Sequence, residues 1–88
     1  MLKLPQIVYR ILRGGRSNGT EYALMPTQEN YEKGCVVIDM SDQTSDIYLH
    51  TEKESLVDDE IQYFDFKLTL PTVEVTDWVA VHSSHHRN

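Results

Sequence analysis

The amino-acid sequence predicts a mainly β fold: a β-rich α+β domain built as a small antiparallel sheet or partly open barrel of five to six short strands with one short helix. Apolar and polar residues alternate in several segments, which is the spacing of half-buried strands. Turn-forming residues separate these segments. A length of 88 residues with 40% hydrophobic side chains supports one modest core. We therefore expect a single domain over residues 1–82 and a frayed polar tail over 83–88.

The first two strands are expected to form a hairpin around Asn18-Gly19. This pair most readily adopts the two positive φ angles of a type I′ turn. A two-residue turn here places Gly15 opposite Tyr22, whose ring could cover the glycine. The alternative is a six-residue loop over residues 14–19.

The middle of the chain is expected to hold the helix and a second strand pair. Thr27 can cap a short helix that ends at Gly34, where a positive φ angle is favourable. Strands over residues 35–40 and 46–50 then flank a polar turn.

The clearest strand signal lies further along the chain. Phe64, Phe66, Leu68 and Leu70 are apolar at every second position, which places one face on a core and the other in water. A final strand is expected over residues 73–82, which are rich in β-branched side chains.

Two stretches allow more than one interpretation. Ile61 and Tyr63 lie on the opposite phase from Phe64, which indicates either a bulge near Tyr63 or the end of a helical turn. Residues 52–60 fit a helix or a loop, because Thr51 and Glu54 resemble a capping box.

Charge is unevenly distributed along the chain. Residues 1–34 hold five Lys and Arg against three acidic residues, whereas residues 35–88 hold three against eleven, so their net charges are +2 and −8. A field of one sign influences which partners approach and how fast they associate. Since no motif names a reaction, charge is the main guide to function.

The acidic half predicts a binding function without catalysis. Dense carboxylates can occupy the basic surface of another protein, imitate a nucleic acid there and speed the encounter. Small acidic inhibitors of viruses and mobile elements have this general composition. We expect a non-enzymatic interaction module that inhibits or modulates a larger protein, such as one that handles nucleic acids. The partner-binding acidic face is expected to consist of Asp42, Asp46, Glu52, Glu54, Asp58, Asp59 and Glu60.

A basic cluster supports an alternative, nucleic-acid binding by a small β-barrel. Arg10, Arg13 and Arg16 carry guanidinium groups suited to phosphate, and Tyr22 could stack on a base beside them. These arginines could equally balance nearby acids on a solvated hairpin. The net charge of −6 opposes binding of a polyanion except at this cluster. A third possibility is a structural subunit that pairs its β-edges with copies of itself.

No catalytic site is expected, although one group of residues invites the idea. Ser41 or Ser45 could meet His50 and Asp39 within one hairpin, but proximity in a turn does not define a catalytic triad.

No metal or cofactor is expected either. A zinc site would need paired ligand spacing, which is lacking in Cys35, His50, His82, His85 and His86. Neither a signal peptide nor an apolar run long enough to span a bilayer is present, so no membrane association is expected. Because Cys35 is the single cysteine, a reducing cytoplasm suits the chain best.

Overall fold

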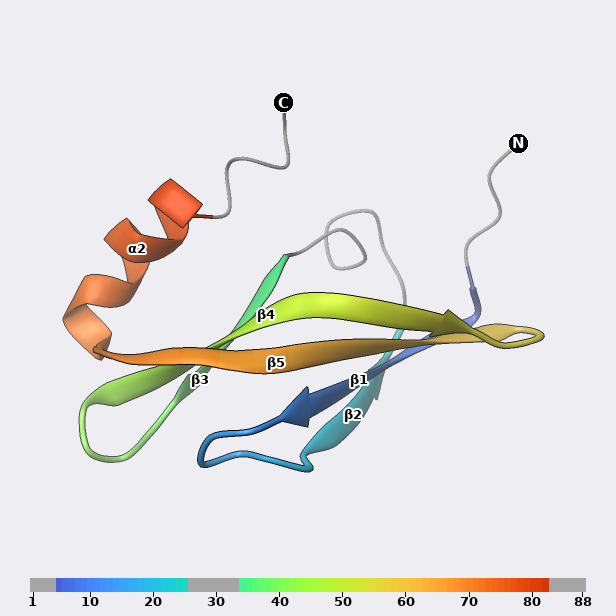
Figure 1. Ribbon diagram of the computed structural model, residues 1–88, viewed down its shortest axis with the longest axis horizontal. Helices are drawn as coiled ribbons and strands as arrows, with labels where there is room; N and C mark the ends of the chain where they lie inside the picture. Colours follow the sequence, from blue (N-terminus) through green and yellow to red (C-terminus); the bar gives the residue numbers. More distant parts are fainter. Residues whose placement is uncertain (1–4, 26–33, 83–88) are drawn as a thin grey trace.

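The structure is a computed structural model of the chain, and it describes residues 5–25 and 34–82. Most of these residues lie in five strands, followed by one short helical segment (Figure 1). The strands are β1 (Ile7–Arg13), β2 (Glu21–Leu24), β3 (Cys35–Asp39), β4 (Thr44–Ser55) and β5 (Asp59–Pro71). A 3-10 turn, η1 (Thr72–Glu74), leads into helix α2 (Val75–His82). The predicted mainly β class with one short helix is confirmed.

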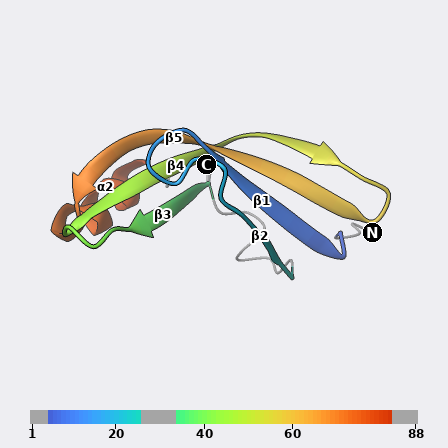
Figure 2. The same ribbon diagram turned by 90° about the horizontal axis from the view of Figure 1, so that it is seen from below.

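The five strands form one mixed sheet in the order β2-β1-β5-β4-β3. Strands β1 and β5 are parallel, and the other three neighbouring pairs are antiparallel. The sheet arches into a half-barrel (Figure 2). The parallel pair departs from the predicted antiparallel arrangement. Because its strands are far apart in the sequence, no local turn signals that they pair.

The main hydrophobic cluster lies on one face of the sheet, which we call the inner face, while Ile47 of β4 is buried on the opposite face. Leu12 of β1 pairs with Phe64 of β5, and Val36 of β3 pairs with Tyr48 of β4, so the four side chains lie on one face. Together they form the hydrophobic cluster, in which all except Val36 are fully buried. Burial of each such side chain stabilises the fold by about 1.5–3 kcal/mol.

The connection between strands β1 and β2 contains a loop over residues 14–19, and the predicted two-residue turn is wrong. Ile11 pairs with Glu21, and Tyr22 lies opposite Arg10 rather than opposite Gly15. The connection spans residues 14–20, one residue longer than the alternative six-residue loop, and its bends and turns fall on residues 14–19.

Glycine is required in this loop because the chain passes close to the inner face. Gly15 has a φ angle of +68°, and a Cβ there would lie 2.6 Å from Cδ1 of Phe66 and 2.9 Å from the hydroxyl of Tyr48. Gly19 has a φ angle of +89° but faces open space. Gly14 has a φ angle of +90°, and a Cβ there would lie 3.2 Å from Cβ of Phe66, so both Gly14 and Gly15 are fixed by backbone angle and packing, with the closer contact at Gly15.

The β4–β5 hairpin contains two irregularities, and the first concerns Tyr63. His50 pairs with Phe64 whereas Glu52 pairs with Tyr63, so Thr51 is an extra residue in β4. A bulge does lie near Tyr63, but on the neighbouring strand. The helical-turn interpretation is wrong, since Tyr63 is within a regular part of β5 and faces away from Phe64.

The second irregularity interrupts the alternation predicted across residues 64–70. Tyr48 pairs with Phe66 whereas Ile47 pairs with Leu68, so Lys67 is an extra residue in β5. Leu68 and Leu70 therefore lie on the opposite face from Phe66, which we call the outer face. The prediction of one apolar face over this stretch is correct only as far as Phe66.

Residues 52–60 are neither a helix nor a long loop. Strand β4 continues to Ser55, and the turn of residues 56–58 closes where the amide of Leu56 donates to the carbonyl of Asp59 at 2.9 Å. We call residues 52–59 the acidic arm. It forms the tip of the long hairpin in Figure 1, away from α2.

The predicted last strand over residues 73–82 is wrong, because this segment forms η1 and α2. Val75, Trp78, Val79 and His82 recur at helical spacing, which the β-branched composition obscured. The Trp78 and His82 rings stack with centroids 4.0 Å apart, linking consecutive turns. The short helix predicted between Thr27 and Gly34 falls on residues 26–33, which lie outside the described residues.

Candidate interaction surface

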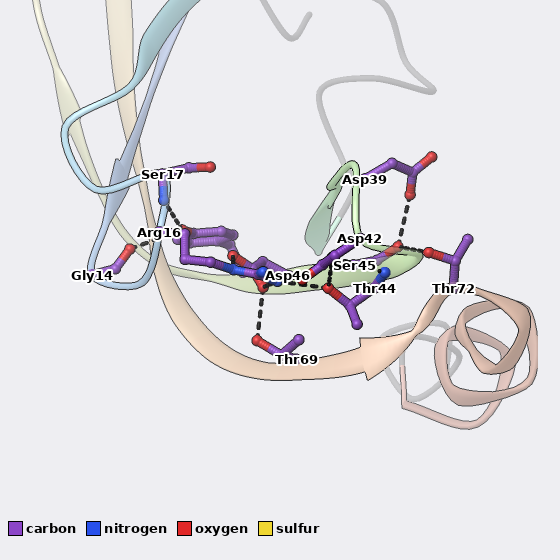
Figure 3. A network of polar contacts seen from close by, with 11 residues as sticks. Gly14, Arg16, Ser17, Asp39, Asp42, Thr44, Ser45, Asp46, Thr69 and Thr72 are labelled. Atoms are coloured by element: carbon purple, nitrogen blue, oxygen red, sulfur yellow. Dashed lines mark hydrogen bonds and ion pairs between the residues drawn. The ribbon is translucent and has the colours of Figure 1, made fainter.

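Arg16, in the 14–19 loop, is held by two carboxylates near the β3–β4 turn. Its Nη2 lies 2.6 Å from Oδ1 of Asp46, and its Nη1 lies 2.9 Å from Oδ2 of Asp42. Its Nε also donates to Oδ2 of Asp46 at 3.2 Å, and its Nη2 donates to Oγ1 of Thr44 at 2.9 Å (Figure 3). We call these four residues the arginine clasp. Its two-pronged contact with one carboxylate is a strong form of ion pair.

Asp46 is the buried member of the clasp, with no exposed surface. Thr69 of β5 donates its hydroxyl to Asp46 Oδ1 at 2.7 Å. The Arg16 guanidinium, helped by this hydroxyl, holds the pKa of Asp46 below its ordinary value although burial acts in the other direction. Asp46 in turn raises the pKa of Arg16. The clasp fastens the loop to the sheet. The guanidinium of Arg16 is therefore occupied by contacts within the chain.

Tyr48 fastens the same loop from the inner face. Its hydroxyl donates to the carbonyl of Gly14 at 2.8 Å and accepts from the amide of Ser17 at 3.2 Å. Its ring packs edge-on against Phe66, with centroids 5.7 Å apart. The loop is therefore anchored by an ion pair and by a buried hydroxyl.

Arg13, at the end of β1, is also engaged within the chain. Its Nε and Nη2 donate to the two carboxylate oxygens of Asp65 at 2.6 and 3.1 Å. Its Cζ lies 4.5 Å from the ring centroid of Tyr63, and its Nη1 lies 3.7 Å from Glu52. The hydrogen bonds to Asp65 raise the pKa of Arg13, and Arg13 lowers the pKa of Asp65.

Arg10 is buried on the inner face and belongs to a polar chain of side chains. Its Nε donates to Gln62 Oε1 at 3.0 Å, and Gln62 Nε2 donates to Glu60 Oε2 at 2.9 Å. Lys53 lies 3.7 Å from Glu60, and the guanidinium of Arg10 lies 5.0 Å from the ring centroid of Phe64. No sequence signal predicts this polar network, since Gln62 and Glu60 resemble solvated strand residues.

The residues predicted for nucleic-acid binding do not form one basic patch. Arg10 faces inward, Arg13 lies on the outer face, and Arg16 is part of the clasp. Tyr22 lies on edge strand β2, partly exposed. The acids that balance the arginines are distant in sequence.

The predicted acidic face is divided by the fold. Asp46 and Glu60 are buried, so they cannot belong to a contact surface. Asp42 is half-exposed but is bound by Arg16. The remaining four are brought together on the acidic arm: Glu52, Glu54, Asp58 and Asp59.

The arm also carries apolar side chains at its turn. Val57 is 97% exposed and Leu56 is 45% exposed. Within residues 5–25 and 34–82, neither Asp58 nor Asp59 makes an ion pair. The turn of the acidic arm therefore presents two apolar side chains beside two carboxylates that have no ion-pair partner among the described residues.

The fold separates His50 from Ser45 and Asp39, two other residues considered for catalysis. Ser45 donates its hydroxyl to Asp39 at 2.8 Å and lies 2.8 Å from the Thr72 hydroxyl (Figure 3). His50 is on the inner face, stacked on Phe64 with centroids 5.1 Å apart. Ser45 lies on the outer face, because it pairs with Leu70. These three groups therefore do not converge.

The described part of the chain lacks a cluster of metal ligands, since it contains no group of three or more His, Cys, Asp and Glu side chains placed to hold a metal ion. Over the same residues, no helix has the length and apolar character needed to cross a membrane. His85 and His86 lie outside the described residues.

Comparison with protein families, with curated proteins and with solved structures finds no match to this chain. The charges and surfaces described above are therefore the guide to the function of this chain.

Proposed function

We propose that this chain is a small acidic interaction module without catalytic activity, which docks on the basic surface of a larger protein and inhibits or modulates it. The observation that carries the proposal is the division of charge within the fold. The arginine side chains are engaged with groups of the same chain, whereas the carboxylates of Asp58 and Asp59 on the acidic arm make no ion pair with any described residue. The acidic arm is thus available to an external cation.

The net charge of the described residues supports this proposal. They hold five Lys and Arg against twelve Asp and Glu, a net charge of −7. Such an excess steers a basic partner toward the surface and speeds association at low salt. The engaged arginines leave little positive surface to offset it. A cytoplasmic setting is part of the proposal, since Cys35 has no second cysteine to pair with.

The alternative of nucleic-acid binding is less well supported. Phosphate contacts would have to compete with Asp65 for Arg13 and with Asp46 for Arg16. Anisotropy titrations with single-stranded DNA, duplex DNA and RNA at about 50 and 200 mM salt test this alternative, because a phosphate binder loses affinity steeply over that interval. We expect no binding at either concentration.

The proposed function is tested with purified core histones as a defined basic protein. The double variant Asp58→Lys/Asp59→Lys changes the acidic arm, and Glu74→Lys/Asp77→Lys makes the same change in net charge near α2. We expect the arm variant to bind at least tenfold more weakly than the helix variant. Equal losses in both variants would mean that net charge alone determines binding, and the arm would lose its assigned role.

A further inference from the structure

The outer face of the sheet carries an apolar patch beside the acidic arm. In the parallel register of β1 and β5, Tyr9 pairs with Ile61, and Ile11 pairs with Tyr63. These four side chains share one face because paired residues point to the same side of a sheet. Each is only partly buried. We call them the outer patch.

Carboxylates surround the outer patch on several sides. Glu52 of β4 pairs with Tyr63, and Glu54 pairs with Ile61, so both acids lie on the outer face. Glu21 of β2 pairs with Ile11 on the opposite side. Asp59 occupies the outer face at the start of β5. The result is an aromatic and aliphatic centre with an acidic rim.

We propose that the outer patch is the docking surface of this module, and that its partner is a protein surface with an apolar centre ringed by Lys and Arg. This inference rests on the function proposed above and specifies where the partner binds. An apolar centre rich in tyrosine within a polar rim is the usual anatomy of a protein interface. Tyrosine is also among the residues that most often dominate binding energy.

Contacts within the chain support the outer patch. The guanidinium of Arg13 covers one face of the Tyr63 ring, and the Tyr63 hydroxyl donates to Glu54 at 3.3 Å. Behind the patch, the same two strands bury Val8, Leu12 and Phe64 on the inner face. A surface supported in this way loses little conformational entropy on binding.

The acidic rim selects one kind of occupant. A second copy docking through the same face would bring two acidic rims together, and like charges across an interface are unfavourable. A nucleic acid would meet the same repulsion. Helix α2 follows the other end of β5, beyond Pro71, and is not positioned to cover the patch. Charge complementarity therefore favours a basic protein surface.

The test uses three synthetic peptides of equal length as probes. One is a cationic amphipathic peptide of Lys and Leu, the second replaces each Leu by Ser, and the third replaces each Lys by Glu. Binding is measured by amide chemical-shift mapping of the full chain. We expect the Lys/Leu peptide to bind about tenfold more tightly than the Lys/Ser peptide. Its shifts should centre on Tyr9, Ile11, Ile61 and Tyr63.

A matched pair of variants locates the contact. Ile61→Thr removes apolar surface from the patch while keeping a β-branched side chain, and Val81→Thr makes a similar change on α2, where the valine is 70% exposed. We expect Ile61→Thr to weaken Lys/Leu binding about tenfold and Val81→Thr to leave it unchanged. Thermal unfolding confirms that both variants are folded. Equal affinity of the Ile61→Thr variant and the parent chain would overturn the inference.

The outcomes separate this inference from the proposed function. Equal binding of the Lys/Leu and Lys/Ser peptides, with shifts at Asp58 and Asp59, would support an acidic binding module but reject the outer patch. Binding of the Glu/Leu peptide with the same affinity as the Lys/Leu peptide would reject a basic partner. Chemical-shift changes centred on α2 would reject the outer patch as the binding site. Failure of both cationic peptides to bind would contradict the inference and the proposed function together.

Discussion

The two ends of the β4–β5 hairpin differ in whether their carboxylates have a cationic partner within the chain. At the end near the β3–β4 turn, Asp46 is buried and Arg16 binds it through two nitrogens. At the acidic arm, Asp58 and Asp59 make no ion pair with any described residue. The first arrangement stabilises the fold, whereas the second leaves charge available for a partner. A carboxylate's role in this chain is therefore determined by whether the fold supplies its cation.

The largest expected effect comes from removing the buried carboxylate of the clasp. Asp46→Asn keeps the side-chain shape but deprives Arg16 of its main partner. We expect a loss of about 3 kcal/mol in unfolding free energy, the low end for a broken buried pair, because Arg16 still reaches water. Glu54→Gln on the acidic arm is the matched control and should change stability little. Chemical denaturation of both variants measures the difference, and equal losses would contradict the comparison.

Acid should also lower the unfolding free energy by weakening the clasp, and the loss should be no larger than that caused by Asp46→Asn. Arg16 lowers the pKa of Asp46 below its ordinary value of 3.8. A carboxylate with a lowered folded pKa contributes stability above its unfolded pKa and loses it as the pH falls through the folded value. Unfolding free energy should therefore decrease below about pH 4. The Asp46→Asn chain should show a shallower decrease, and parallel curves would exclude Asp46 as the titrating group.

The loop held by the clasp offers a third comparison, between two glycines. Gly15→Ala places a Cβ 2.6 Å from the Phe66 ring at a positive φ angle, whereas Gly19→Ala meets open space at a similar angle. We expect Gly15→Ala to cost about 2 kcal/mol and Gly19→Ala about 1 kcal/mol, because only the first adds a clash to the backbone strain. Thermal unfolding of both variants checks the order. The reverse order would mean that the loop can move away from the inner face.

The sequence predicted the parts of this fold that depend on neighbouring residues. Alternation placed Phe64 in a strand, and the apolar run from Cys35 placed β3. The same reasoning failed for α2, because valine and threonine favour strands while Trp78 and His82 stack only once a helical turn forms. Propensity was overridden by contacts within the segment.

The pairing of the arginines could not be predicted for a different reason. Arg13 and Asp65 are 52 residues apart, and Arg16 and Asp46 are 30 apart. Only the parallel pairing of β1 with β5 and the path of the 14–19 loop bring them together, and neither has a local sequence signal. For the same reason, the acidic residues could be recognised as a set but not divided into buried and available members.

The smallest expected effect compares two tyrosine hydroxyls on the two faces of the sheet. Tyr48 is fully buried, and its hydroxyl bonds to Gly14 and Ser17, so Tyr48→Phe should cost about 1 kcal/mol and leave Ser17 without its acceptor. Tyr63→Phe removes only an exposed hydrogen bond to Glu54 and should leave stability unchanged. Amide exchange at Ser17 should rise in the first variant alone. If Tyr63→Phe proved the more destabilising, the outer face would be contributing to folding, and its tyrosines would no longer be available mainly for a partner.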